Sequence, residues 1–213
     1  MRINLLRSLV TILLIAATAL AQAPAGGGQR GAGGQRGGAP GAGGGQRGGG
    51  APPAVGPMRL INSSWFDGGV IPQLYAGAMG VSPDLTWTNI PMGTMSFVLL
   101  MHDPDGAPQR GSADVLHWLV VNIPATTYAI PEGWSKGTMP EGTTQIQVYR
   151  GPGAPAIAPM HHYTIELFAL DQKLTLPANA TRADVMKAMD MHVIGKAANV
   201  GLYHQPAAPP AAQ

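Results

Sequence analysis

The chain has 213 residues, of which 45% are hydrophobic and 11% are charged, and it contains no cysteine. Without cysteine it can form neither a disulfide nor a lipidated cysteine anchor, so its folded part must be held together by a buried core. Five of its 13 basic residues precede residue 55, which leaves eight basic against all 11 acidic residues in the remainder, a charge of about −3. That balance gives no support for a nucleic-acid-binding face on the folded part.

Residues 1–21 have the layout of a cleavable secretory signal peptide. Two arginines give a positive start, residues 9–20 form an apolar run, and Ala19-Leu20-Ala21 supplies the small-x-small pattern that a signal peptidase accepts. The apolar run has 12 residues, whereas a membrane-spanning helix needs roughly 20. We therefore predict export, cleavage near Ala21, and a secreted or periplasmic mature protein that starts at Gln22 and has no transmembrane segment.

Residues 22–54 form a low-complexity segment rich in Gly, Gln and Arg. The pentapeptide Gly-Gly-Gln-Arg-Gly occurs three times, at 27–31, 33–37 and 44–48. Because the segment has no aromatic or large aliphatic side chain to bury, nothing offsets the entropy lost on ordering, and we predict a disordered linker. A nucleic-acid-binding arm would be expected to interleave aromatic residues for base stacking, and this segment has none. Weak adhesion to anionic cell-envelope polymers stays open.

Residues 55–206 have the length of a single domain, and residues 207–213 are predicted to be a disordered tail. Strands are predicted at 95–102, 115–123, 144–149 and 162–170. The first two are apolar runs bounded by Gly, Pro or Asp, and the last alternates apolar and polar residues from Tyr163 onward. Frequent turn residues between these runs favour an antiparallel sandwich.

A helix is predicted to start after Thr181, since Asp184 three residues later completes a variant of the capping box. Val185, Met186 and Met189 form its apolar stripe. We expect the helix to pause near Asp190 and to resume over residues 193–198. The predicted fold class is thus all-β, an antiparallel β-sandwich with one or two short peripheral helices.

Polar side chains that could bind a ligand or take part in a reaction lie at the ends of the predicted strands. Asp103-Pro104-Asp105 ends one strand, His117 lies within the next, and His161-His162-Tyr163 begins another. Gly151 and Pro152 open a loop whose free backbone amides are expected to face a ligand. Strand ends of a sandwich can converge on a small pocket with a rigid rim. Taken alone, His117 also fits a core histidine whose ring nitrogens are hydrogen-bonded.

Five elements occur in a recognisable order and spacing: Ser82-Pro83-x-Leu85-x-Trp87, Asp103-Pro104-Asp105, His117-x-Leu119-Val120-Val121-Asn122, Gly151-Pro152 and His161-x-Tyr163. This order resembles the phosphatidylethanolamine-binding protein family, and most closely its bacterial Raf kinase inhibitor-like branch. Met191-His192-Val193-Ile194 and Gly201-x-Tyr203 are similar to the family's C-terminal pattern. The resemblance covers most of residues 58–205. It implies a Greek-key β-sandwich with a small anion pocket for phosphate-like groups or phospholipid headgroups.

The resemblance also implies which residues line that pocket. The predicted ligand-binding set is Asp103, Asp105, His117, Gly151, Pro152, His161 and Tyr163. Imidazole N–H groups and the tyrosine hydroxyl would donate to the anion, backbone amides would complete the cradle, and Asp103 would fix one histidine tautomer.

Three departures from the family pattern affect the predicted pocket. Gly106 is inserted where the family usually reads Asp-Pro-Asp-Ala-Pro. His162 stands where the family commonly has arginine, which removes a fixed positive charge near the pocket. Gly153-Ala154-Pro155 interrupts the family's paired prolines. These departures affect the prediction of which ligand binds more than they affect the prediction of the fold.

Three functional classes compete, and a small-ligand or headgroup binding module is favoured. A protein-interaction module is the second class, and export makes a protease a more reasonable partner than a cytoplasmic kinase. An enzyme is the third, with Asp103, His117 and His161 as a two-His, one-carboxylate metal site or with a His–Asp pair as a general base. The chain has no Gly-x-Ser-x-Gly, His-Glu-x-x-His or cysteine nucleophile. We therefore predict no enzymatic activity and no cofactor or metal.

Overall fold

The computed structural model describes residues 56–107 and 111–209. The predicted signal peptide and linker, residues 1–54, lie outside the described residues, as do residues 210–213 of the predicted tail. Residues 207–209 are exposed and have no regular secondary structure. Within the described ranges, no helix has the length and apolar character needed to cross a bilayer.

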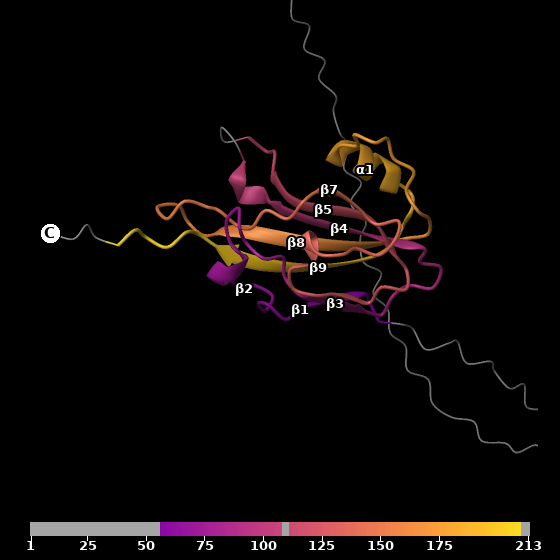
Figure 1. The fold of residues 1–213 in the computed structure, drawn as a ribbon, viewed down its shortest axis with the longest axis horizontal. Helices are drawn as coiled ribbons and strands as arrows, with labels where there is room; N and C mark the ends of the chain where they lie inside the picture. The colour runs from indigo at the N-terminus through magenta and orange to yellow at the C-terminus, as the bar shows by residue number, and fades with distance from the viewer. Residues whose placement is uncertain (1–55, 108–110, 210–213) are drawn as a thin grey trace, which may run out of the picture. The chain divides into compact units, whose positions relative to one another are not determined.

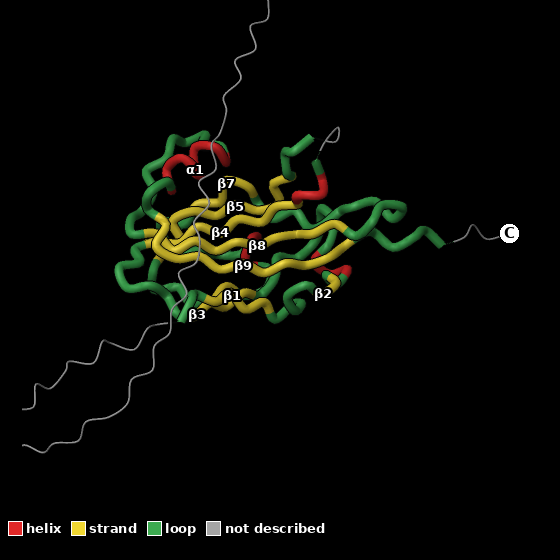
Figure 2. The backbone as a smooth tube through the Cα atoms, turned by 180° about the vertical axis from the view of Figure 1, so that it is seen from behind, coloured by secondary structure: helices red, strands yellow, loops and turns green. Residues whose placement is uncertain are grey.

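Two β-sheets form the described domain, as Figure 1 shows. The strands are β1 (Arg59–Asn62), β2 (Gly69–Val70), β3 (Leu85–Thr88), β4 (Ser96–Asp103), β5 (Val115–Pro124), β6 (Ala129–Ile130), β7 (Thr144–Gln147), β8 (His161–Leu170) and β9 (Val193–Tyr203). The larger sheet has the order β2-β9-β8-β4-β5-β7 and the smaller one β1-β3-β6. Between the β4–β5 hairpin and β8 the chain visits both sheets before it returns beside β4, a Greek-key connection. Figure 2 shows both sheets from behind.

The central strands of the larger sheet are apolar on both faces, which explains the continuous apolar run at residues 95–102. Phe97, Leu99 and Met101 of β4 pack into the core between the two sheets. Val98 and Leu100 point to the opposite face, where they pack with the helix α1 (Arg182–Met189). The predicted all-β sandwich is therefore confirmed, with strands within one or two residues of the expected bounds.

Strand pairing brings the candidate residues to one end of the larger sheet. β4 runs antiparallel to both of its neighbours, so its last residues meet the first residues of β5 and β8. Asp103 is paired with Val115, two positions before His117, and His102 is paired with Thr164. The strand ends that carry Asp103, His117 and His161 therefore meet, as the sequence predicted.

The capping box at Thr181 and Asp184 is present, and α1 follows it. The predicted continuation of the helix over residues 193–198 is wrong, because this segment begins the 11-residue strand β9. Met191 has a φ of 65°, in the left-handed region, and the chain then returns to pair with β8 along its length. The Ala and Lys residues of this segment look helical locally, but pairing with β8 outweighs that weak preference. Three short 3-10 turns at Gln73–Tyr75, Pro104–Gly106 and Trp134–Lys136 complete the described elements.

We expect Thr181→Ala to lower the free energy of unfolding by about 1 kcal/mol, because the mutation removes the side chain that caps the first turn of α1. Urea unfolding followed by circular dichroism measures the change. Thr126→Ala is the matched control, since Thr126 is exposed in the turn after β5. Equal stability of the two variants would contradict a stabilising cap.

Candidate functional site

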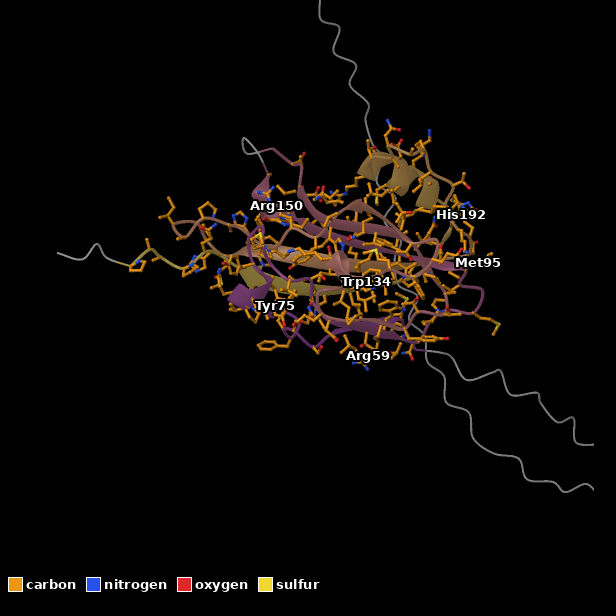
Figure 3. The ribbon with its side chains drawn as sticks, viewed as in Figure 1. Arg59, Tyr75, Met95, Trp134, Arg150 and His192 are labelled. Carbon is orange, nitrogen blue, oxygen red and sulfur yellow. The ribbon has the colours of Figure 1, made fainter. Side chains whose placement is uncertain are left out.

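A cavity of about 240 Å³ lies at the end of the larger sheet where β4 ends and β8 begins. Its lining comes from the ends of β4, β5 and β8 and from the loop that precedes β8. The lining residues are Asp103, Gly106, Val115, His117, Arg150, Gly151, Gly153, Ala154, Pro155, His161 and Tyr163. Five members of the predicted set, Asp103, His117, Gly151, His161 and Tyr163, are thus brought together. Figure 3 shows Arg150 at this end of the domain, opposite Met95 and His192.

Asp103 is the buried carboxylate of the cavity and is only 3% exposed. Its Oδ1 accepts the backbone N–H groups of Asp105 and Gly106 at 2.9 and 2.8 Å, and its Oδ2 lies 2.9 Å from Nδ1 of His161. Gly106 approaches so closely that a Cβ there would lie 3.0 Å from Oδ2. The glycine that departs from the family pattern is therefore accommodated as a hydrogen-bond partner of Asp103.

The two histidines of the cavity are each anchored through Nδ1. His117 donates from Nδ1 to the backbone carbonyl of Arg150 at 2.7 Å, and His161 donates to Asp103. Burial lowers the pKa of His117, although the Arg150 carbonyl and the charge of Asp103 act in the opposite direction. His117 is therefore a neutral imidazole near neutral pH. The prediction that Asp103 fixes one histidine tautomer agrees with its bond to His161.

Tyr163 forms the floor of the cavity between the two imidazole rings. Its ring lies edge-on to His117 with centroids 5.1 Å apart and stacks with His161 at 6.4 Å. The side chain is fully buried, and its hydroxyl oxygen accepts the backbone N–H groups of Gly153 and Ala154 at 3.2 and 3.1 Å. Burial is the main reason that the pKa of Tyr163 rises to about 12. Tyr163 thus holds the loop in place through its hydroxyl oxygen, and the predicted donation from its O–H to an anion stays a prediction.

The expectation that free amides of the glycine-proline loop face a ligand is wrong. The N–H of Gly151 donates to the carbonyl of Gly77 at 3.0 Å, Pro152 has no N–H, and the next two amides bond to Tyr163. A buried N–H must find a partner within the protein, so these N–H groups form the hydrogen bonds that hold the loop in place. The cavity therefore presents side chains to a ligand in place of backbone amides.

Two of the predicted residues do not line the cavity. Asp105 is exposed and accepts both the backbone N–H and Nδ1 of His162 at 2.7 Å, and the backbone bond is the main reason that the pKa of Asp105 is lowered. Pro152 faces another hollow, and its carbonyl accepts the N–H of Gly77 at 2.7 Å. His162 therefore pairs with Asp105 outside the cavity.

Arg150 is the cavity residue that sequence reasoning missed. It is exposed at the rim and, within residues 56–107 and 111–209, is the only lysine or arginine that lines the cavity. The sequence could have indicated this residue, because Arg150 stands directly before Gly151 of the predicted pocket loop. It is also the only lysine or arginine between Lys136 and Lys173. Its guanidinium restores the positive charge that the His162 departure was expected to remove.

The metal-site alternative is not supported by the arrangement of these side chains. Across residues 56–107 and 111–209, no group of three or more His, Asp or Glu residues is placed to hold a metal ion. Asp103 uses both of its oxygens within the protein, Oδ1 for two backbone N–H groups and Oδ2 for His161.

Comparison with known proteins agrees with this architecture. The family model for phosphatidylethanolamine-binding proteins matches residues 62–204. The chain belongs to the phosphatidylethanolamine-binding protein family. A UPF0098 protein of Methanothermobacter thermautotrophicus is 35% identical over 156 residues, which cover 70% of this chain and 99% of the relative. UPF0098 protein YbhB of Escherichia coli is 31% identical over 160 residues, which cover 68% of this chain and 99% of YbhB.

Among solved structures, Escherichia coli YbcL, described as a new member of the mammalian PEBP family, is similar to this chain. The TM-score is 0.63 at 27% identity, and the match covers 70% of this chain and 99% of YbcL. These family members are matched almost end to end, whereas about 30% of this chain lies outside the match.

We expect Gly151→Ala to lower the free energy of unfolding by about 2–3 kcal/mol, because a Cβ at this position would lie 2.2 Å from the carbonyl oxygen of Tyr75. Gly153→Ala is the matched control: its Cβ would meet no atom within 4 Å, and we expect a change within about 1 kcal/mol. Chemical denaturation of both variants tests the difference. If Gly151→Ala were as stable as Gly153→Ala, the close approach of the loop to Tyr75 would be refuted.

Proposed function

We propose that this family member is an exported binding protein whose cavity takes a small phosphate-like anion, either free or as the headgroup of a phospholipid. The observation that carries the proposal is the convergence of Arg150, His117 and His161 on one small cavity. A guanidinium forms charge-assisted hydrogen bonds with phosphate oxygens, and an imidazole adds a hydrogen bond to the phosphate group through its free Nε2. A volume of about 240 Å³ suits a headgroup better than a drug-sized molecule.

The proposal contains no catalytic step. In the part of the chain that the structure describes, no serine, threonine or cysteine lines the cavity. Its one hydroxyl, that of Tyr163, is buried and engaged with the loop.

A protein partner, such as a protease that the domain inhibits, is the second candidate. It is favoured by the ten residues 151–160, which contain no charged or hydroxyl side chain and border the cavity. Ile157 in this segment is 99% exposed. Loss of protease inhibition in an Ile157→Ser variant that still binds phosphate would favour this candidate over the first.

We expect phosphate binding to weaken about 10- to 100-fold in Arg150→Gln and in His117→Ala, since each removes a hydrogen bond to a charged group worth about 1.5–3 kcal/mol. Isothermal titration calorimetry with inorganic phosphate measures this. Arg150 is exposed, so its variant tests the site even where His117→Ala lowers stability. His192→Gln, at the opposite end of the sheet, is the control and should bind like wild type. Unchanged affinity in both site variants would refute the assignment.

We expect the protein isolated from the periplasm of a Gram-negative host to begin at Gln22. The signal pattern of residues 1–21 is the reason, and intact mass spectrometry is the measurement. Replacing Ala21 with Lys should leave the precursor uncleaved, because the small residue before the cleavage site is lost. Recovery of the full-length chain from the cytoplasm of the same host would rule out export.

A further inference from the structure

The hydrogen bonds of the two cavity histidines determine which ring nitrogen carries the proton. Nδ1 of His117 lies 2.7 Å from the Arg150 carbonyl oxygen, and Nδ1 of His161 lies 2.9 Å from Oδ2 of Asp103. A carbonyl and a carboxylate oxygen can only accept, so each Nδ1 must be protonated. In the neutral form of each ring, Nε2 then carries a lone pair and acts as an acceptor.

These two Nε2 atoms are available to a ligand. Both rings line the cavity, and neither Nε2 has a hydrogen-bond partner among the described residues or is sealed from solvent. The loop amides are already engaged, two of them with the Tyr163 hydroxyl oxygen. Among the described residues, the polar groups left for a ligand are therefore the two Nε2 atoms, the O–H of Tyr163 and the Arg150 guanidinium.

The surrounding charges disfavour a doubly charged ligand. The groups that face His117 are Asp103 from β4, Tyr163 and His161 from β8, and Arg150 from the loop. Tyr163 is neutral because its pKa is raised to about 12, and burial keeps His117 neutral near pH 7. A dianion would therefore meet the buried carboxylate of Asp103 and the Nε2 lone pair of His117, with Arg150 as the one permanent cation among the described residues that line the cavity.

We propose that the cavity selects ligands that bring their own acidic proton: singly protonated phosphate monoesters and phosphonates, in preference to phosphodiesters. This inference rests on the proposed function and names the ligand class of the same site. The P–OH group donates to Nε2 of His117, and the remaining oxygens accept from Arg150. A diester has no P–OH, so it forms a hydrogen bond with Nε2 of His117 only when the imidazole first takes a proton from solvent. Among lipid headgroups, phosphatidic acid has the required monoester and phosphatidylethanolamine does not.

The selection has a distinct dependence on pH. A phosphate monoester loses its second proton near about pH 6, and an alkylphosphonate holds that proton to a higher pH. Diester binding must be lost as pH rises through the lowered pKa of His117. Phosphonate binding must persist until the ligand itself is deprotonated. The difference in affinity between the phosphonate and the diester should therefore increase from acid to neutral pH.

Calorimetric titration of the mature protein with methylphosphonate, phosphoethanolamine and the diester glycerophosphoethanolamine, from about pH 5 to about pH 8, tests the selection. We expect all three to bind in acid, and the diester to lose at least about tenfold more affinity than methylphosphonate by about pH 7. Equal affinities of diester and phosphonate across the range would overturn the inference and leave the proposed function standing. Absence of binding by all three at every pH would overturn the proposed function itself.

The His117→Gln variant tests whether the ligand preference depends on the acceptor at Nε2 of His117 or only on the charges around the cavity. A glutamine amide can turn either its N–H or its oxygen toward the ligand, so the preference for methylphosphonate over the diester should fall to within about threefold. His192→Gln should keep the wild-type preference. A preference unchanged in His117→Gln would refute the role of Nε2. Should His117→Gln fail to fold, the pH profiles of the wild type still decide the question.

Binding to vesicles distinguishes a monoester that is a lipid headgroup from one that is free in solution. Phosphatidylcholine vesicles containing phosphatidic acid are incubated with the protein and sedimented, with and without phosphoethanolamine. Retention that phosphoethanolamine reverses supports a lipid monoester, whereas no retention alongside tight binding of free phosphoethanolamine supports a soluble one. Equal retention on vesicles containing phosphatidylethanolamine in place of phosphatidic acid would count against the selection.

Discussion

The carboxylate of Asp103 is the interaction on which the rest of the site depends. A buried charge is tolerated only when hydrogen bonds replace the water that it loses. Asp103 meets that demand with two backbone N–H groups of the turn that follows β4 and with the Nδ1 proton of His161. The same three bonds fix the turn, hold β8 against β4 at the rim of the cavity and set the tautomer of His161. Loss of this carboxylate would therefore disturb three elements at once.

Tyr163 and the loop after Arg150 form the second constraint. The loop donates to the Tyr163 hydroxyl and to Gly77, and the carbonyl of Arg150 accepts from His117. A loop held in this way is pre-organised, so a ligand has little ordering entropy to overcome. It also has no free amides to offer along these residues. Recognition is therefore left to side chains, among them the imidazole of His117, whose pKa is lowered by burial.

The position of the domain in a longer chain affects which ligands it can meet. The family match begins at residue 62, and the Gly-Gln-Arg segment and the predicted signal peptide precede it. Export would place the cavity outside the cytoplasm and limit it to the anions that are present there. A domain with a charge of about −3 gains little from non-specific attraction to anionic surfaces. Selectivity then depends on the cavity itself.

The sequence by itself determined the strands that form the sheet's centre, because β4, β5 and β8 bury side chains densely enough to show as apolar runs. It also determined the capping box of α1 and the chain order of Asp103, His117, His161 and Tyr163. It could not determine β9, whose pairing with β8 outweighs a weak local helical preference, or the small sheet of short strands. Only the tertiary structure decided that Arg150 reaches the cavity while Asp105 and Pro152 do not. It also decided that the loop amides and the Tyr163 hydroxyl are already engaged, because hydrogen-bond partners distant in sequence are chosen by packing.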